Sequence, residues 1–178
     1  GGAVLLQMCE RPGARDRQDD GRVLQEPRQG HLTRERADPS RLVTIPTVDD
    51  PQLAPEGCST LYVLEPVPNL GGPTDWRSET PRLRERLLNF LETQGYPTDI
   101  VTERLYTPID WQAMGMAEGT PFALAHTFRQ TGPFRPGNRE KRLPGLFFAG
   151  SGTTPGVGVP MVLISGKLAA TRVREYAP

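Results

Sequence analysis

The sequence predicts an α/β (α+β) fold, in which short strands and two main helices alternate with long turn-rich segments. Three observations lead to this class. Residues 42–48 and 59–65 have the apolar pattern and the length of strands. Residues 81–93 carry one apolar face at helical spacing, and a second helix follows a glycine-rich segment near the C-terminus. The 19 glycines and 19 prolines among 178 residues argue against a coiled coil or a helical bundle.

The first forty residues differ from the remainder of the chain. Residues 1–40 contain 7 arginines, 7 acidic residues and no aromatic side chain. From residue 10 to residue 39 no hydrophobic period of 2 or 3.6 persists. We therefore expect residues 1–40 to be an atypical segment, which is either disordered or has lost its fold partners.

Two strands are expected next. Residues 42–48 alternate like a half-buried strand, in which Pro46 marks an edge or a break. Residues 59–65 form a second run of strand length, and Pro66 and Pro68 are expected to end it.

The first helix is expected over residues 81–93. Thr80 can cap it, Pro81 suits its first position, and Gly95 suits the position after its end. One apolar face is formed by Leu83, Leu87, Leu88, Phe90 and Leu91.

A short strand and a short helix are expected after Gly95. The strand covers residues 101–106. The sequence Thr-Pro-Ile-Asp at 107–110 is typical of a capping box that opens a helix. Residues 115–144 are expected to form a long loop that glycine and proline punctuate.

The C-terminal residues carry the strongest pattern. Residues 146–149 form an apolar run of strand length, residues 150–159 are rich in glycine, and a helix is expected from Pro160 to about residue 175. A strand, a glycine loop and a helix N-terminus in this order can hold an anionic group, because unpaired amides point at the ligand. A small-residue face on the helix lets another backbone come close, and it consists of Ser165, Gly166, Ala169 and Ala170.

The glycine loop alone is only moderately specific. The dinucleotide-binding pattern G-x-G-x-x-G fails, because Pro155 follows Gly150 and Gly152 where a third glycine is needed. A tight strand-to-helix connection without a ligand is the alternative interpretation.

Composition restricts the partners and the compartment. The 21 basic and 21 acidic residues cancel, which removes the usual basis for binding nucleic acid through bulk charge. Cys9 and Cys58 lie far apart, and His31 and His126 have no ligand-type neighbours, so zinc and a disulfide framework are not expected. No apolar run reaches the length of a membrane span, and the first residues lack the pattern of a secretory signal.

Four segments, taken in order, resemble one protein family. Residues 144–170 read PGLFFAGSGTTPGVGVPMVLISGKLAA, and residues 47–70, 107–110 and 134–139 read TVDDPQLAPEGCSTLYVLEPVPNL, TPID and FRPGNR. These segments resemble bacterial-type phytoene desaturases, which are FAD-dependent carotenoid desaturases of the amine-oxidase-like flavoprotein superfamily. The resemblance extends from about residue 43 to residue 174 and does not include residues 1–40.

The resemblance implies that the chain is a C-terminal fragment of a two-domain flavoprotein. The chain does not begin with Met, and the half of such a protein that would carry G-x-G-x-x-G is absent. Residues 41–140 would be part of a substrate-binding domain built on a mixed sheet. Residues 141–178 would be the strand, loop and helix that complete a Rossmann-like FAD-binding domain, and residues 1–40 would be non-homologous.

The resemblance also implies the residues that bind FAD. Gly150, Ser151 and Gly152 would lie against the pyrophosphate or the ribityl chain, although Ser151 stands where related flavoproteins often have an acidic residue. The helix N-terminus would lie near the pyrimidine edge of the flavin, where it stabilises negative charge. The residues at that end are Gly158, Val159, Pro160 and Met161.

The implied reaction transfers hydride from a long apolar polyene to the flavin in carotenoid biosynthesis. Because the flavin performs the chemistry, no catalytic side chain and no metal ligand is assigned. Asp49 and Asp50 are interpreted as turn residues, Asp110 as a helix cap, and His126 as a satisfied or solvated histidine.

Two further sets of residues keep two interpretations each. The first set either lines an apolar tunnel or packs in an ordinary core, and it consists of Met114, Met116, Phe122 and Phe128. Arg135 and Arg139 either approach a cofactor phosphate or lie on a solvated loop.

Two alternatives to a carotenoid desaturase stay open. One is a related carotenoid or retinoid flavin oxidoreductase, namely a ketolase, isomerase or saturase. The other is a non-catalytic, truncated remnant. We expect the isolated chain to be inactive and to bind FAD weakly or not at all. The expected partner is an apolar polyene, which implies peripheral contact with a membrane. The cysteine usage fits a cytoplasmic protein, and the balanced charge fits the expectation of no nucleic-acid partner.

Overall fold

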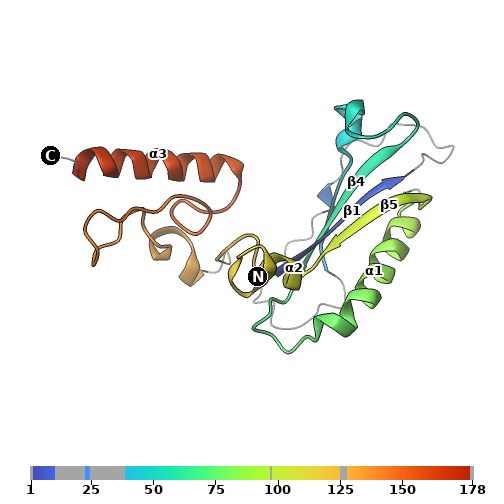
Figure 1. Cartoon of the computed structure of the whole chain (residues 1–178), viewed down its shortest axis with the longest axis horizontal. Helices are drawn as coiled ribbons and strands as arrows, with labels where there is room; N and C mark the ends of the chain where they lie inside the picture. The colour runs from blue at the N-terminus through green and yellow to red at the C-terminus, as the bar shows by residue number, and fades with distance from the viewer. Residues whose placement is uncertain (1, 11–22, 25–38, 97, 125–127, 177–178) are drawn as a thin grey trace. The chain divides into compact units, whose positions relative to one another are not determined.

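The computed structural model describes residues 2–10, 23–24, 39–96, 98–124 and 128–176, which form two compact units (Figure 1). The sheet unit contains the described residues up to Gly119, and the C-terminal unit begins at Thr120. The boundary expected after residue 140 therefore falls inside the C-terminal unit.

Among the described residues, the sheet unit has five strands in the order β2-β3-β4-β1-β5. Their bounds are Gly2–Glu10 for β1, Val23–Leu24 for β2, Arg41–Thr44 for β3, Ser59–Val67 for β4 and Ile100–Tyr106 for β5. Every pair of neighbouring strands is antiparallel, so the expectation of a mixed sheet is wrong. The physical reason is that β4 and β5 run in the same direction but β1 lies between them, antiparallel to both.

Strand β1 corrects the expectation that residues 1–40 are disordered. Residues 2–10 form the strand between β4 and β5, and Leu5 is paired with Leu64 on one side and Tyr106 on the other. Leu6 and Met8 are buried, at 0% and 1% exposure. A strand paired on both sides draws its stability from partners distant in sequence, which a local pattern of nine residues does not reveal. The expectation for residues 11–22 and 25–38 lies outside the described residues.

The last residues of two strands also differ from the prediction. Strand β3 ends at Thr44 and Pro46–Val48 forms a 3-10 turn, so only the first half of the predicted run is a strand. Strand β4 continues through Pro66 to Val67. Proline is tolerated there because β3 pairs only with residues 62–64, so the amide hydrogen that Pro66 lacks is not needed by that neighbour.

Helix α1 (Trp76–Thr93) begins earlier than the sequence predicts. Asp75, and not Thr80, is the N-cap, and its carboxylate accepts hydrogen bonds from the Arg77 amide at 3.1 Å and the Ser78 hydroxyl at 2.8 Å. Pro81 consequently lies inside the helix, where its ring is exposed. The predicted end is confirmed, since Gly95 follows the helix with φ of +81°.

Strand β5 and helix α2 (Pro108–Ala113) occur where they were predicted. The Asp110 carboxylate accepts hydrogen bonds from the Thr107 amide and the Thr107 hydroxyl, both at 2.8 Å. Asp110 is therefore a helix cap, as expected. Gly119 closes this region with φ of +63°, and a Cβ there would lie 2.2 Å from the Pro108 carbonyl oxygen, so no larger residue fits.

The core of the sheet unit lies between α1 and one face of the sheet (Figure 1). Residues of β4 alternate, with Leu61, Val63, Glu65 and Val67 buried on the face that α1 covers. The buried apolar cluster consists of Leu6, Met8, Val43, Leu61, Val63, Val67, Trp76, Leu83, Leu87 and Leu91. Burial of each large side chain contributes about 1.5–3 kcal/mol, which makes this cluster the main source of stability in the unit.

Glu65 is the one carboxylate among the buried residues of this face of β4. Its side chain is 2% exposed, and it pairs with Arg41 of β3 at 2.7 Å and with Arg86 of α1 at 3.0 Å. The guanidinium of Arg41 also lies 4.5 Å from the centre of the Phe90 ring. Glu65 thus joins two strands and a helix through charge-assisted hydrogen bonds.

Replacement of Glu65 is expected to destabilise the sheet unit strongly. Glu65→Gln leaves Arg41 and Arg86 without their buried counter-charge, so the free energy of unfolding should fall by about 3–5 kcal/mol. The matched control is Glu103→Gln, because Glu103 pairs with Arg84 at a more exposed position and should contribute less than about 1 kcal/mol. Urea denaturation of the 178-residue chain measures both. Equal losses in the two variants would contradict this role.

The N-cap of α1 is expected to make the sheet unit acid-sensitive. Hydrogen bonds from the Ser78 hydroxyl and the Arg77 amide hold the pKa of Asp75 below its ordinary value. Because the pKa is lower in the folded state, this contribution is present above the ordinary pKa and is lost as the pH falls through the folded one. Asp75→Ala lacks this contribution at every pH. When the pH is lowered below about 4, thermal unfolding should therefore show a smaller loss of stability in Asp75→Ala than in the unchanged chain. An identical pH dependence in both proteins would refute the assignment.

Candidate functional site

The C-terminal unit contains helix α3 (Val159–Tyr176) and a long loop that precedes it. The strand predicted at 146–149 is not formed. Instead, Phe147 makes a single antiparallel bridge with Arg139, supported by bonds from Glu140 N to Leu146 O and from Phe148 N to Asn138 O, both at 3.0 Å. The reason is that the described residues of this unit provide no sheet against which the run could pair.

The side-chain amide of Asn138 forms hydrogen bonds with several parts of the loop and with α3. Asn138 is 8% exposed. Its Nδ2 lies 3.1 Å from the Phe148 carbonyl oxygen, 3.2 Å from the Thr154 carbonyl oxygen and 3.0 Å from the Ser165 Oγ. It also lies 3.2 Å from the Thr153 Oγ1. Since the amide has two hydrogens, it shares them among these acceptors and holds both ends of the loop to α3.

Ser165 is the point at which the loop meets α3. Its side chain is fully buried, and its Oγ accepts a hydrogen bond from the Gly150 amide at 3.0 Å and lies 2.7 Å from the Thr153 Oγ1. The small-residue face predicted on this helix is confirmed at Ser165 and Ala169, which are buried, whereas Ala170 is exposed. A small residue at 165 therefore allows the close approach of a backbone, as the sequence suggests.

The structure places the predicted cofactor-binding residues in two stretches of one loop. Gly150, Ser151 and Gly152 form the first stretch, and all three are half-buried. The second stretch, at the start of α3, is exposed and consists of Gly158, Val159, Pro160 and Met161. Gly150 and Gly158 have φ of +116° and +108°, which requires glycine.

Space is left beside the glycines of this loop. A Cβ built at Gly150, Gly152 or Gly158 would meet no atom within 4 Å among the described residues. Gly152 does not have a positive φ, so neither conformation nor packing within the described chain requires glycine there. A glycine of this kind is typical of a position against which a ligand lies. The exposed amides of a helix N-terminus follow in the same loop, which suits a ligand with negative charge.

Two buried side chains that hold this loop were given no such role by the sequence. They are Asn138, in the segment 134–139, and Thr153, in the glycine loop. A buried serine on an apolar helix such as α3 was the available signal, because a buried hydroxyl needs hydrogen-bond partners. The partners themselves come from a segment more than twenty residues away, since Asn138 and Ser165 are separated by 27 positions.

Loss of the Asn138 amide should release the loop from α3. Asn138→Ala removes the side-chain donor of the Phe148 and Thr154 carbonyl oxygens and one of the partners of Ser165, and we expect the unit to lose about 1–3 kcal/mol of stability. Thr171→Ala is the matched control, because Thr171 is an exposed residue of α3 whose hydroxyl bonds to Lys167 O. Amide hydrogen exchange at Gly150, followed by NMR, should accelerate in Asn138→Ala and stay unchanged in Thr171→Ala. Unchanged exchange in both variants would contradict the assignment.

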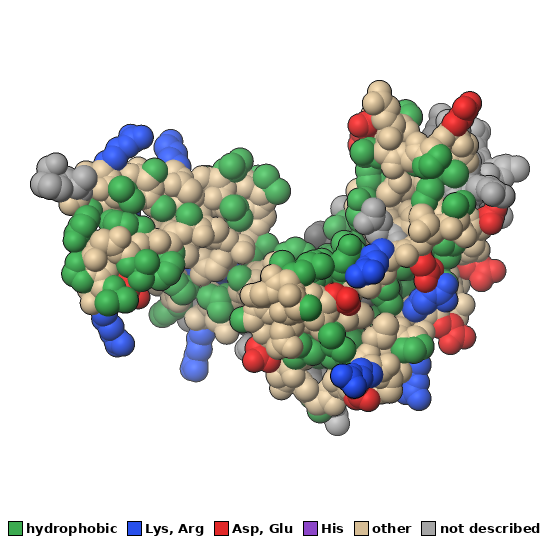
Figure 2. Space-filling view, viewed as in Figure 1, with side chains coloured by type: hydrophobic (Ala, Val, Ile, Leu, Met, Phe, Trp, Pro, Cys, Tyr) green, Lys and Arg blue, Asp and Glu red, His purple; other side chains and the backbone are tan. Residues whose placement is uncertain are grey.

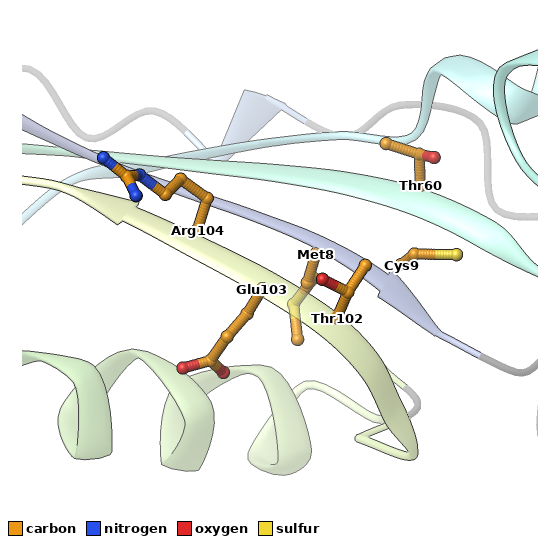
Figure 3. Close-up of a pocket in the computed structure, with 6 residues that line it drawn as sticks. All are labelled: Met8, Cys9, Thr60, Thr102, Glu103 and Arg104. Carbon is orange, nitrogen blue, oxygen red and sulfur yellow. The ribbon is translucent and has the colours of Figure 1, made fainter.

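A small cavity in the sheet unit is a second candidate (Figure 3). It has a volume of about 170 Å³ and is lined by Met8, Cys9, Thr60, Thr102, Glu103 and Arg104. Met8 and Glu103 extend toward α1, whereas Cys9 and Thr60 leave the sheet on the opposite side (Figure 3). Glu103 is engaged by Arg84, and Thr60 Oγ1 donates to Leu53 O at 2.8 Å. The cavity does not bring these groups together as a catalytic set.

The other polar residues considered from the sequence have structural surroundings. Asp50 caps a 3-10 turn, since its carboxylate accepts the Gln52 amide at 3.0 Å, and Asp49 is exposed in the same turn region. His126 lies outside the described residues. Within the described ranges no group of three or more His, Cys, Asp or Glu side chains is placed to hold a metal ion.

Two of the apolar residues of the loop region are exposed. Met114 and Phe122 are 53% and 42% exposed, so the interpretation as core packing is wrong for these two, and Met116 is half-buried. The side chain of Phe128 is not among those described. Exposed apolar side chains also cover the first half of α3, visible in the space-filling view (Figure 2). Even so, no helix in the described part of the chain is long and apolar enough to cross a membrane.

Comparison with known proteins assigns the chain to a class. The chain belongs to the family of flavin containing amine oxidoreductases, whose sequence pattern matches residues 6–174. The match encloses the whole glycine loop and also begins within β1, so it includes part of the segment 1–40 that was expected to lie outside the family.

Three curated relatives share a high sequence identity with the chain. The chain is 54% identical over 143 residues to a phytoene dehydrogenase of Streptomyces griseus, which covers 77% of the chain and 28% of that protein. It is 43% identical over 145 residues to a zeta-carotene-forming phytoene desaturase of Myxococcus xanthus, covering 79% and 28%. It is 41% identical over 135 residues to a lycopene-forming phytoene desaturase of Pantoea ananas, covering 73% and 27%. The chain thus spans just over a quarter of the length of these relatives.

Proposed function

We propose that the chain is the C-terminal part of an FAD-dependent carotenoid desaturase, in which the glycine loop contacts the cofactor. The observation that carries the proposal is the family match across residues 6–174, which contains a loop whose glycines leave room for a ligand. The named relatives are a dehydrogenase and two desaturases of phytoene, which favours desaturation over a ketolase, isomerase or saturase reaction.

The residues of the loop fit a flavin nucleotide. Gly150, Ser151 and Gly152 would hold the pyrophosphate or the ribityl chain through backbone amides and one hydroxyl. The start of α3 would lie beside the flavin ring, where the amides at a helix N-terminus stabilise negative charge. The residues of that second stretch are Gly158, Val159, Pro160 and Met161. FAD, when bound, supplies the acceptor for a hydride, so the chain needs no catalytic side chain of its own.

The sheet unit suits an apolar substrate. Side chains on the face of the sheet opposite α1 include the half-buried Leu5, Tyr62 and Leu64. Met114, which follows α2, exposes further apolar surface in this unit. Contact with a long polyene would bury such surface, and each apolar side chain covered contributes favourably to binding. We therefore propose that residues 41–140 contribute to substrate binding and residues 141–178 to FAD binding, with peripheral contact with the membrane that holds the substrate.

The test joins the chain to the remainder of a relative. In a chimera, this chain replaces the matching segment of the Streptomyces griseus phytoene dehydrogenase. The purified chimera should show visible flavin absorption and should convert phytoene to a product with more conjugated double bonds. A chimera that folds without flavin, or that binds flavin without converting phytoene, would overturn the proposal.

A substitution within the loop sharpens the test. Gly152→Glu places a carboxylate where we expect the pyrophosphate, and like charges in contact cost several kcal/mol, so the Kd for FAD should rise by more than about a hundredfold. The matched control is Gly137→Glu, because Gly137 is exposed, also lacks a positive φ, and a Cβ added there would meet no atom within 4 Å. Fluorescence titration of the apo-chimera measures both, and equal affinities would place the cofactor elsewhere.

A further inference from the structure

Arg135 is a buried cation that packs against the glycine loop. Its exposed fraction is 4%. The guanidinium donates through Nε to Thr153 O at 3.2 Å, through Nη1 to Gln130 O at 3.1 Å, and through Nη2 to Ser151 O. Two of these three acceptors belong to the loop itself. Arg135 therefore does not lie on a solvated loop, and each of its three guanidinium nitrogens already donates one hydrogen bond to a backbone oxygen.

The charge of Arg135 has no counter-charge within the described residues. All three of its acceptors are backbone carbonyl oxygens, and no carboxylate pairs with it in the described part of the chain. A buried charge without an opposite charge is costly, and carbonyl dipoles offset only part of that cost. Gly156 lies directly against the guanidinium, since a Cβ there would be 3.5 Å from Nε. An anionic group at this loop would meet a positive field that the chain itself does not neutralise.

The hydrogen bond from Arg135 also sets the direction of one amide. The carbonyl of Ser151 points at the guanidinium, and the peptide bond to Gly152 is trans, because the cis bond of this loop is that between Thr154 and Pro155. In a trans peptide the N–H points opposite to the C=O. The Gly152 amide is consequently directed away from Arg135, and it finds no acceptor among the described residues.

We propose that Arg135 is a positioning residue for the cofactor. Its guanidinium holds the peptide between Ser151 and Gly152 so that the Gly152 amide faces an anionic group of the ligand, and its charge lies behind that amide. The proposal rests on the proposed function, in which the anionic group is the pyrophosphate of FAD. Guanidinium geometry matters, because a lysine keeps the charge but carries all its N–H donors on one nitrogen, whereas Arg135 reaches its three acceptors from three nitrogens.

The first arm of the test needs no cofactor and uses the full chain. The NMR signal and the hydrogen exchange of the Gly152 amide are compared in Arg135→Gln, in Arg135→Lys and in the matched control Arg139→Gln. Arg139 is an exposed neighbour whose guanidinium lies 5.0 Å from the centre of the Tyr176 ring. Both substitutions at 135 should shift the Gly152 signal, and the control should leave it unchanged.

The second arm uses the chimera with the Streptomyces griseus protein. Arg135→Gln and Arg135→Lys should raise the Kd for FAD by about tenfold or more, since hydrogen bonds to charged groups are among the stronger ones. At saturating FAD, the kcat and KM for phytoene should stay within about twofold of the unsubstituted chimera. A purely structural residue would lower stability and kcat together, so this split separates the two roles.

The outcomes distinguish failure of this proposal from failure of the proposed function. If the unsubstituted chimera takes up no FAD, the proposed function is rejected. If the Gly152 signal still shifts in the chain with Arg135→Gln or Arg135→Lys, the role of Arg135 in orienting the Gly152 amide is kept. If the chimera binds FAD with the same Kd before and after Arg135→Gln and Arg135→Lys, the positioning role is rejected. Loss of all signals of the C-terminal unit in both variants at 135, but not in Arg139→Gln, also rejects it, because Arg135 would then be required for folding alone.

Discussion

The conformation of the glycine loop depends on buried hydrogen bonds to backbone oxygens and hydroxyls. A loop rich in glycine has little packing of its own and a large conformational entropy to lose, so some other part of the chain must define its path. Here Asn138 and Arg135, which are close in sequence, bond to different atoms of it: Asn138 ties it to Ser165 of α3, and Arg135 holds the carbonyls of Ser151 and Thr153. The segment 134–139 thereby acts as a frame for residues 150–158.

The two units are stabilised by different means. In the sheet unit, ten buried apolar side chains pack between α1 and the sheet, and Glu65 adds ion pairs with Arg41 and Arg86. In the C-terminal unit, the buried polar residues Arg135, Asn138, Thr153 and Ser165 outnumber the buried apolar ones, among which only Ala169 is found in the described part. Polar networks specify geometry because each bond has a direction, whereas apolar burial is proportional to area. The unit that must present a shaped loop is the one held by directional bonds.

Local signals in the sequence predicted those elements whose stability is local. Strand β5 and helix α2 lie where expected, and the cap at Thr107 and Asp110 and the end of α1 at Gly95 are as predicted from the sequence. Two of the wrong predictions have one cause in common, which is pairing with distant residues. Strand β1 needs β4 and β5 on its two sides, and the run 146–149 would be a strand only with a sheet beside it. The start of α1 was missed because Pro81 is typical of a first helical turn, yet Asp75 supplies the stronger cap.

The placement of β1 has a consequence for how the sheet unit folds. Its residues are synthesised before those of β4 and β5, but Leu5 finds its partners only at Leu64 and Tyr106. Closing such a long loop costs conformational entropy before the contacts between the strands stabilise the fold, so the sheet should form slowly and late. Without β4 and β5, β1 has unpaired backbone amides and exposed apolar side chains, and unpaired strands of this kind are prone to aggregation.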